Sequence, residues 1–351
     1  MKKSCVDYLT CIECGAEHLD ISVDQSDDDE IMEGAIRCSC GAAYPIIRGV
    51  PRMFTAEMLK PVLHEYGVSS AAQVAAKASS DGTVDVQRRT MDAFGFEWRE
   101  YNDYDANNYY DWMPEGFEPA KAFSGKIGLE VGCGAGRHAE ITSKWAKVHF
   151  AVDLSYAVDS AFERLRKLPN CHVIQADAFN LPFKKGHIFD YVYCLGVLQH
   201  MHNPPAGFRM LAELPKTGGT LLVNVYQSSR PVVTGLLQVF RNVTTRIPAR
   251  PLNWLCWVLG TIDYGFSAAW RAADKAGLGK ILSPVVPKRT KEYAKHSYAT
   301  SVADWYDRLS CPEKYHYSDQ ELASWYKDAG YSEIRVTPYW KAFWNGFGVR
   351  A

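Results

Sequence analysis

The chain has 351 residues, of which 47% are hydrophobic, and its 39 Lys and Arg nearly balance its 40 Asp and Glu. This length exceeds one average domain and can bury a substantial core. The net charge of -1 excludes an overall electrostatic attraction to nucleic acid or an anionic membrane, so such a partner would need a local patch.

The first residues, MKKSCVDYLTCIECG, contain no apolar stretch of signal-peptide length. Cys133, Cys171 and Cys194 lie in apolar runs, where a thiol usually acts as a small buried hydrophobe. We therefore expect a reducing, cytoplasmic location.

Residues 1–60 are acidic and turn-rich, with eleven Asp and Glu against six Lys and Arg. Cys11 and Cys14 form C-x-x-C, and Cys38 and Cys40 form C-x-C after an interval of 23 residues. Four thiolates so arranged are typical of tetrahedral zinc. We predict a zinc-ribbon-like domain over 1–60 whose zinc is structural, since four protein ligands leave no position for water. Free thiols in a metal-free ribbon are the alternative.

Residues 61–120 contain a helix-like stretch and then an aromatic tract, FGFEWREYNDYDANNYYDWM. From residue 126 onward, short β-branched runs alternate with helical patterns, which predicts an α/β fold with a doubly wound parallel sheet. We predict strands at residues 127–131, 148–152, 172–176, 189–195 and 219–226.

Residues 226–300 interrupt this alternation and hold eleven Lys and Arg against three Asp and Glu. We predict a helical insertion after the fifth strand. Within it, residues 251–270 carry a single charge, Asp263, and are long enough on paper to span a bilayer. The central Asp263 and neighbouring Gly260 and Gly265 favour a buried or amphipathic helical hairpin over a transmembrane segment, and leave peripheral membrane contact open.

The sheet pattern then resumes. Ser318 and Glu321 match a helix capping box, and Gly330 lies where a helix end favours a left-handed residue. We predict the last two strands near 334–337 and 342–349.

Three glycines follow the first strand of this pattern, in LEVGCGAGRH. Gly132, Gly134 and Gly136 would let backbone N–H groups and a helix N-terminus approach a ligand without obstruction by Cβ. The spacing is G-x-G-x-G, and Arg137 stands where a dinucleotide fingerprint has its third glycine. Asp153 ends the second strand, where a carboxylate can accept ribose hydroxyls, and Asp177 ends the third, where it can accept from an adenine amino group.

These residues, with Glu130 before the glycines and YCLGVLQHMHNP after the fourth strand, resemble the class I S-adenosylmethionine-dependent methyltransferases, particularly those with the type 11 methyltransferase domain. The resemblance covers 126–226 and resumes near 316. It implies a Rossmann-like, doubly wound, seven-stranded sheet with an antiparallel last strand, and a methyltransferase domain over 121–351 that contains a helical substrate lid at 227–316.

The resemblance also implies a donor site for S-adenosylmethionine, with the methionine part at the glycine loop, the ribose at Asp153 and the adenine at Asp177. Phe96, Trp98 and Arg99 belong to a segment similar to one that precedes this domain in relatives, and we expect 61–120 to close over the donor, with Arg99 at its carboxylate. The predicted donor-binding residues are Trp98, Arg99, Glu130, Gly132, Gly134, Gly136, Asp153, Leu154, Asp177, Ala178, Leu195 and His200.

The ribbon carries a second resemblance. CGAAYPIIRGVPRM is similar to small zinc-ribbon proteins that partner or precede methyltransferases, in which the second cysteine pair is usually C-x-x-C. This departure leaves the role of Cys38 open, with Cys5 as a substitute ligand.

Methyl transfer from a sulfonium is an in-line displacement that mainly requires alignment of the nucleophile and exclusion of water. A neutral hydroxyl or an ammonium acceptor would also benefit from a general base. His200, His296 and Tyr298 are the candidate catalytic residues, although His200 could instead pack or line the donor site.

We expect methylation of a nitrogen or oxygen of a small molecule, such as a specialised metabolite, and the basic insertion favours an anionic acceptor. One alternative is methylation of tRNA, rRNA or a translation protein, suggested by the ribbon. The other is a non-catalytic donor-binding scaffold. Nucleic acid is disfavoured because the ribbon is acidic and no aromatic-basic RNA motif is present. The oligomeric state is left open.

Overall fold

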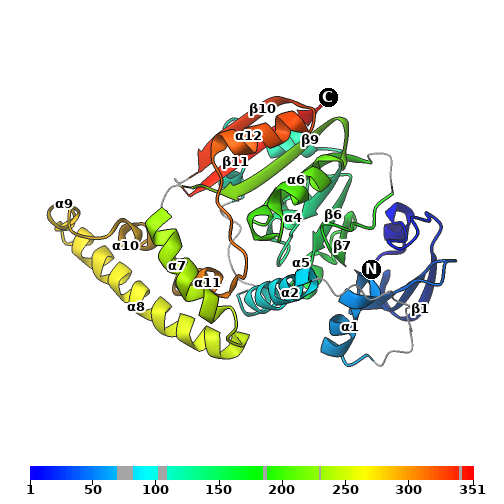
Figure 1. Cartoon of the computed structure of the whole chain (residues 1–351), viewed down its shortest axis with the longest axis horizontal. Helices are drawn as coiled ribbons and strands as arrows, with labels where there is room; N and C mark the ends of the chain where they lie inside the picture. Colours follow the sequence, from blue (N-terminus) through cyan, green and yellow to red (C-terminus); the bar gives the residue numbers. More distant parts are fainter. Residues whose placement is uncertain (69–81, 102–108, 185–187, 229–230, 340–341) are drawn as a thin grey trace. The chain divides into compact units, whose positions relative to one another are not determined.

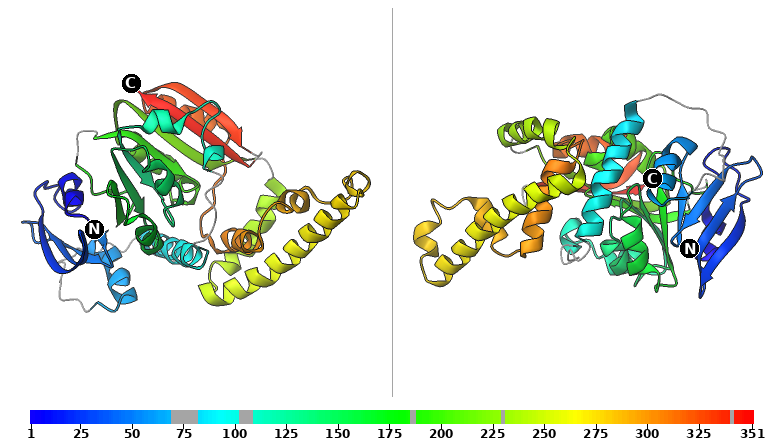
Figure 2. Two further views of the ribbon diagram at one scale, coloured as in Figure 1. Left: turned by 180° about the vertical axis from the view of Figure 1, so that it is seen from behind. Right: turned by 90° about the horizontal axis from the view of Figure 1, so that it is seen from below.

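The computed structural model describes residues 1–68, 82–101, 109–184, 188–228, 231–339 and 342–351. The predicted segment 61–120 therefore lies partly outside the described residues, as do positions 229 and 230 of the predicted insertion. The chain separates into two compact units (Figures 1 and 2). The main unit comprises residues 1–99, 105–229 and 313–351, and the helical unit comprises 100–104 and 230–312.

The main unit contains one mixed sheet in the order β1-β2-β3-β4-β7-β6-β5-β8-β9-β11-β10. The predicted α/β class and doubly wound sheet are confirmed. The predicted number of seven strands is wrong, because the described residues form eleven strands in this sheet. The seven expected strands are present, and four N-terminal strands extend their edge. The strands are β1 (Asp20–Asp27), β2 (Glu30–Arg37), β3 (Ala43–Ile47), β4 (Val50–Met53), β5 (Ile127–Val131), β6 (Val148–Asp153), β7 (Cys171–Ala176), β8 (Phe189–Leu195), β9 (Pro215–Tyr226), β10 (Tyr331–Tyr339) and β11 (Phe343–Arg350).

The extension depends on β4, which pairs in parallel with β7 through Arg52↔Gln175 and Met53↔Ala176. β1 to β4 pair antiparallel with one another, whereas β7, β6, β5, β8 and β9 run parallel. β11 is antiparallel to both β9 and β10, which confirms the antiparallel last strand. The blue N-terminal strands in Figure 1 thus belong to the same sheet as the red C-terminal ones.

Alternate side chains of the parallel strands enter different core clusters. Phe150 and Val152 of β6 join one large cluster, and Ala151 between them joins another. The large cluster also includes Leu9, Ile36 and other ribbon residues, so the N-terminal strands share a hydrophobic core with the parallel sheet.

The helices and 3-10 turns of the main unit are η1 (Lys3–Tyr8), α1 (Ala56–Glu65), α2 (Gly82–Glu100), η2 (Tyr110–Trp112), α3 (Pro119–Phe123), α4 (Arg137–Thr142), α5 (Val158–Leu165), η3 (Leu198–His200), α6 (Pro204–Ala212) and α12 (Asp319–Asp328).

α12 packs against β10 and β11 (Figure 1). Its predicted capping box is present, since Ser318 Oγ accepts from the Glu321 backbone N–H and Glu321 Oε2 accepts from the Ser318 backbone N–H. Gly330 after the helix has φ +77°, the predicted left-handed conformation.

The helical unit follows β9 and confirms the predicted insertion. Its helices are α7 (Pro231–Thr244), α8 (Ala249–Lys275), α9 (Gly279–Leu282), α10 (Lys288–Tyr293) and α11 (Tyr298–Ser310). The predicted hairpin at 251–270 is wrong, because α8, the long yellow helix of Figure 2, runs through it unbroken. Gly260 allows α8 to approach α11, since a Cβ there would lie 2.7 Å from Val302 Cα, and Asp263 is paired with Arg289 Nη2 at 2.7 Å. No helix in the described part of the chain is long and apolar enough to cross a membrane.

Candidate functional site

The parallel strands bring the predicted donor residues to one edge of the sheet. The glycine loop follows β5, Asp153 ends β6, Asp177 follows β7 and Leu195 ends β8. These strands are neighbours in the order β7-β6-β5-β8 and run parallel, so their carboxyl ends meet where open α/β sheets bind ligands.

The glycine loop requires glycine for two reasons. Gly132, Gly134 and Gly136 have φ angles of +84°, +51° and +77°, in the left-handed region that L side chains avoid. A Cβ at Gly132 would also lie 2.2 Å from the Val197 side chain. The left-handed angles and this close packing explain why the loop needs glycine at these positions.

Asp153 holds this loop in place. Its Oδ2 accepts from the Gly134 N–H at 2.8 Å, and its Oδ1 accepts from the Ser155 backbone N–H at 2.7 Å and from its hydroxyl at 2.6 Å. Burial raises the pKa of Asp153 above its ordinary value, although these donors oppose the shift. The carboxylate thus fixes the loop from the neighbouring strand.

Asp177 is bound by a residue that the sequence did not single out. Its Oδ1 accepts from the Phe179 N–H at 3.0 Å, and its Oδ2 accepts from Gln87 Nε2 of α2 at 2.7 Å. Burial raises the pKa of Asp177. Gln87 belongs to α2, so this helix reaches the predicted adenine end of the site.

The same face of α2 continues along the sheet edge. Phe94 packs edge-on against His200, with ring centroids 5.2 Å apart. The Trp98 ring lies 4.7 Å from the Arg137 guanidinium. A Cβ on Gly134 would lie 3.2 Å from the same Trp98 ring. The spacing of Gln87, Met91, Phe94 and Trp98, one every three or four residues, could have indicated from the sequence that they share one helix face.

Arg99 lies in an ion-pair network at the end of α2. Its two guanidinium nitrogens bind Glu65 and Asp159, each at 2.8 Å. Asp159 also pairs with the fully buried Arg52 at 2.8 Å and accepts from the Tyr66 hydroxyl. This network joins β4, α1, α2 and α5, and contact of Arg99 with the donor carboxylate stays a prediction.

Glu130 is buried beneath the glycine loop rather than exposed in it. Tyr193 donates to its Oε2 at 3.1 Å, and His138 Nδ1 lies 3.7 Å from its Oε1. Burial raises the pKa of Glu130 well above its ordinary value and lowers that of His138 to about 3. Tyr193, which sequence reasoning missed, in turn contacts Thr142, so the loop rests on a buried polar network.

The remaining predicted residues lie in different surroundings. Ala178 and Leu195 are packed in hydrophobic clusters at the same edge, and Leu154 packs against the cluster of α1 and Tyr156. His200 is buried, with Nδ1 2.9 Å from the Glu313 carbonyl oxygen. His296 and Tyr298 belong to the helical unit, where Tyr298 Oη is 2.9 Å from Thr261 Oγ1. Their association with His200 stays a prediction.

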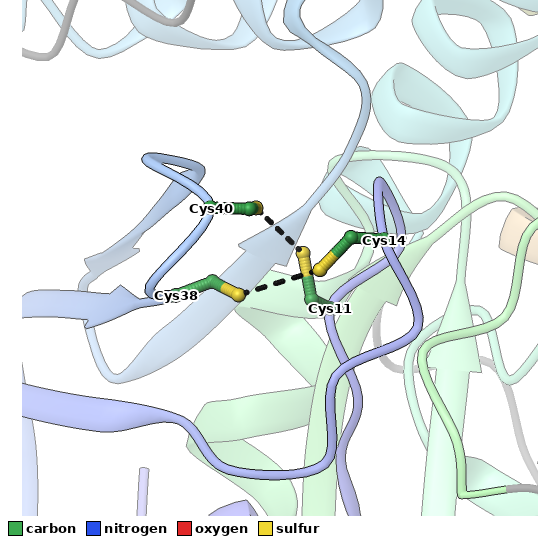
Figure 3. A group of neighbouring side chains, drawn as sticks. All are labelled: Cys11, Cys14, Cys38 and Cys40. Atoms are coloured by element: carbon green, nitrogen blue, oxygen red, sulfur yellow. Dashed lines mark hydrogen bonds between the residues drawn. The ribbon is translucent and has the colours of Figure 1, made fainter.

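The four predicted cysteine ligands come together in the ribbon (Figure 3). The sulfurs of Cys11, Cys14, Cys38 and Cys40 lie within 4.8 Å of one another, with Cys11–Cys40 and Cys14–Cys38 separations of 3.6 Å. Zinc–sulfur bonds of about 2.3 Å in a tetrahedron place thiolates at this kind of separation. The tight C-x-C pair therefore reaches the cluster, while Cys5 lies in the hydrophobic core.

The comparisons with known proteins agree with the fold. Residues 129–223, which include the glycine loop, Asp153 and Asp177, match the model of the Methyltransf_11 family, a methyltransferase domain. The chain therefore contains a methyltransferase domain. The matched segment spans β5 to β9, so the predicted family resemblance is confirmed there.

Solved structures of methyltransferases resemble this methyltransferase at low sequence identity. A protein from Aquifex aeolicus matches with 14% identity over 72% of this chain and 98% of its own, at a TM-score of 0.41. The Synechocystis magnesium protoporphyrin IX methyltransferase matches with 13% identity over 84% and 99%, at a TM-score of 0.37. The search of curated proteins found no match. None of these similarities indicates which molecule this methyltransferase modifies.

Proposed function

We propose that the protein transfers a methyl group from S-adenosylmethionine to a nitrogen or oxygen of a small, anionic molecule. The observation that carries the donor site is the loop of three left-handed glycines hydrogen-bonded to Asp153, with Asp177 on the next strand. When bound, the sulfonium supplies an activated methyl group, so the protein mainly has to orient the acceptor and exclude water.

In this proposal the glycine backbone holds the methionine part, Asp153 the ribose and Asp177 the adenine. Gln87 donates a hydrogen bond to the Asp177 carboxylate. On binding, the adenine of the donor would either replace Gln87 at this carboxylate or bind an Asp177 side chain that Gln87 orients. Trp98 and Phe94 would exclude water from the same side. His200 would line the donor site, and its Nδ1 contact with the Glu313 carbonyl fixes the ring.

The anionic acceptor is inferred from charge. Residues 226–300 carry eleven bases and three acids, whereas residues 1–60 are acidic. A basic insertion next to the donor end of β9 in the chain would concentrate an anionic substrate. A site on a nucleic acid is the rival outcome, and steeply salt-dependent RNA binding would support it.

A structural zinc ion in the ribbon is part of the proposal. The four sulfurs lie within 4.8 Å of one another, which is compatible with tetrahedral zinc, and the Tyr44 hydroxyl lies 3.1 Å from Cys11 Sγ. With all four positions filled by protein, the metal would stabilise the ribbon and take no part in methyl transfer.

Calorimetry with S-adenosylhomocysteine tests the donor site. Asp153→Asn keeps the shape of the side chain but removes its charge, and should weaken binding at least about tenfold, since hydrogen bonds to charged groups contribute about 1.5–3 kcal/mol. Asp328→Asn, an exposed acid on α12, is the control. Unchanged binding in Asp153→Asn would refute the site. The acceptor is then sought by incubating metabolite extracts with isotopically labelled donor.

A further inference from the structure

The helical unit exposes an unusual amount of apolar surface. Sixteen large hydrophobic side chains are exposed in the described chain, and twelve of them belong to this unit. Monomeric soluble proteins rarely display large contiguous apolar patches without a binding function. The twelve are Val239, Phe240, Val243, Trp254, Leu255, Trp257, Val258, Ile262, Phe266, Leu278, Ile281 and Val285.

On α8 these residues form one face of the helix. Trp254, Val258 and Ile262 recur every four residues, and Phe266 continues the series. Trp254 is 75% exposed and Phe266 is 64% exposed. The opposite face, with Leu252, Cys256, Gly260 and Ser267, is buried, and α8 packs there against α11. Apart from Leu252, the buried face carries small residues, whereas large apolar residues line the exposed face, which is unusual for a surface helix.

Exposed bases lie at both ends of this face. Arg246 and Arg250 precede or begin α8, and Lys275 and Lys280 lie at or just beyond its end. Asp263, the one acid between Arg250 and Asp274, points to Arg289 on α10 rather than outward. The α8 face is thus an uncharged apolar stripe with positive charge at each end.

We infer that the α8 face docks on the surface of an anionic lipid bilayer. Apolar and indole side chains would enter the boundary between headgroups and acyl chains, while the terminal bases contact lipid phosphates. This is surface association, in keeping with the absence of a membrane-spanning helix among the described residues. It does not depend on the identity of the methyl acceptor.

Charge argues for lipid over a second copy of the chain. Both ends of the α8 face are basic, so either parallel or antiparallel pairing of two such helices would place bases against bases. A nucleic acid would satisfy the bases but leave the Trp254 and Phe266 side chains without an apolar partner. An anionic bilayer satisfies both features.

Sedimentation of the full-length protein with vesicles tests the inference. We expect the protein to bind vesicles of equal parts phosphatidylcholine and phosphatidylglycerol, and to bind pure phosphatidylcholine much less. Trp254→Ser combined with Phe266→Ser should lower the partition coefficient at least about tenfold. Arg246→Gln combined with Arg250→Gln should lower it roughly 30-fold at low salt.

Matched variants of the main unit serve as controls. Met210→Ser with Val23→Ser removes two exposed apolar side chains, and Lys121→Gln with Lys144→Gln removes two exposed bases. Neither pair should change vesicle binding. Binding of S-adenosylhomocysteine, measured in every variant, shows that the main unit remains folded and separates this inference from the proposed function.

Several outcomes would overturn the inference. The inference is wrong if the protein does not bind anionic vesicles, or if it binds them equally well after the Trp254 and Phe266 changes. Sedimentation could reveal a dimer that those changes dissolve, which would make a second copy the occupant. RNA binding lost in the arginine variants, without vesicle binding, would assign the patch to nucleic acid.

Discussion

The ribbon and the helical unit are both additions to the methyltransferase sheet, but they are stabilised in different ways. The ribbon pairs β4 with β7 and shares the main hydrophobic core, and Arg52 makes a buried ion pair across this junction. The helical unit packs mainly on itself, around α8, α11 and an ion-pair network of Arg289, Asp263 and Asp304. The first addition has become part of the domain, and the second keeps an apolar face exposed. This difference supports the structural role proposed for the ribbon and the binding role proposed for the insertion.

The largest expected effect concerns the zinc ion proposed for the ribbon. Cys38→Ala should abolish the bound zinc and unfold the ribbon, at a cost on the order of 5 kcal/mol or more, because metal binding contributes directly to folding. Elemental analysis and urea unfolding measure these changes. Cys5→Ala removes a buried thiol outside the cluster and should retain one zinc per chain. Retention of zinc in Cys38→Ala would show that Cys38 is not a ligand.

The buried ion pair comes next. Asp159→Ala leaves the Arg52 guanidinium, which is fully buried, without its carboxylate, and should destabilise the main unit by about 3–5 kcal/mol in urea unfolding. Glu163→Ala changes an exposed acid on the same helix and should cost little. If both variants were equally stable, the junction between ribbon and sheet would not depend on this pair.

The corresponding ion pair of the helical unit should have a smaller effect. Burial would raise the pKa of Asp304, but Arg308 and Arg289 outweigh it and hold the pKa below its ordinary value. An unfolded Asp titrates near 3.9, so the contribution of Asp304 is complete above about pH 4 and is lost as the pH falls below this value.

Asp304→Asn should therefore destabilise the helical unit by about 2 kcal/mol at neutral pH, because the side chain is partly exposed. The difference from wild type should shrink near pH 3. Urea unfolding at both pH values measures it, with Asp274→Asn, an exposed acid of the same unit, as reference. A difference that is equal at both pH values would exclude the ion pair as its source.

The smallest effect tests the reach of α2, which follows the ribbon in the chain. Gln87→Ala removes the hydrogen bond to Asp177 and should change the affinity for S-adenosylhomocysteine about threefold to tenfold. The Trp254→Ser and Phe266→Ser changes on α8 should leave that affinity unchanged. If the α8 changes lowered the affinity for S-adenosylhomocysteine and Gln87→Ala did not, the donor site would depend on α8 and not on α2, contrary to the roles proposed for them.

Much of the fold was predictable because it depends on local patterns. The strands predicted at 127–131 and 189–195 match β5 and β8 residue for residue, since short β-branched runs between helical patterns specify buried parallel strands. The capping box at Ser318 was predictable because it involves residues three apart. Asp153 and Asp177 could be predicted to face one edge, because the ends of parallel strands meet there.

Other features depend on residues distant in sequence. The hairpin prediction failed because Gly260 serves close packing against Val302 rather than a turn. Arg99 binds Glu65 and Asp159, which lie 34 and 60 residues away in the sequence, and its contact with the donor carboxylate stays a prediction. Gln87 was overlooked because nothing near it in sequence indicates Asp177 as its partner.

The sequence by itself determined the methyltransferase fold, the glycine loop, the two strand-end acids and the four cysteines, because each depends on spacing within a short segment or on the regular order of parallel strands. Only the tertiary structure decided that β4 joins β7, that Glu130 is buried against Tyr193, and that α8 turns its large apolar residues outward. These depend on which surfaces meet. The periodicity of a sequence predicts that a helix has an apolar and a polar face, but the elements that pack against the helix in the fold determine which face is buried.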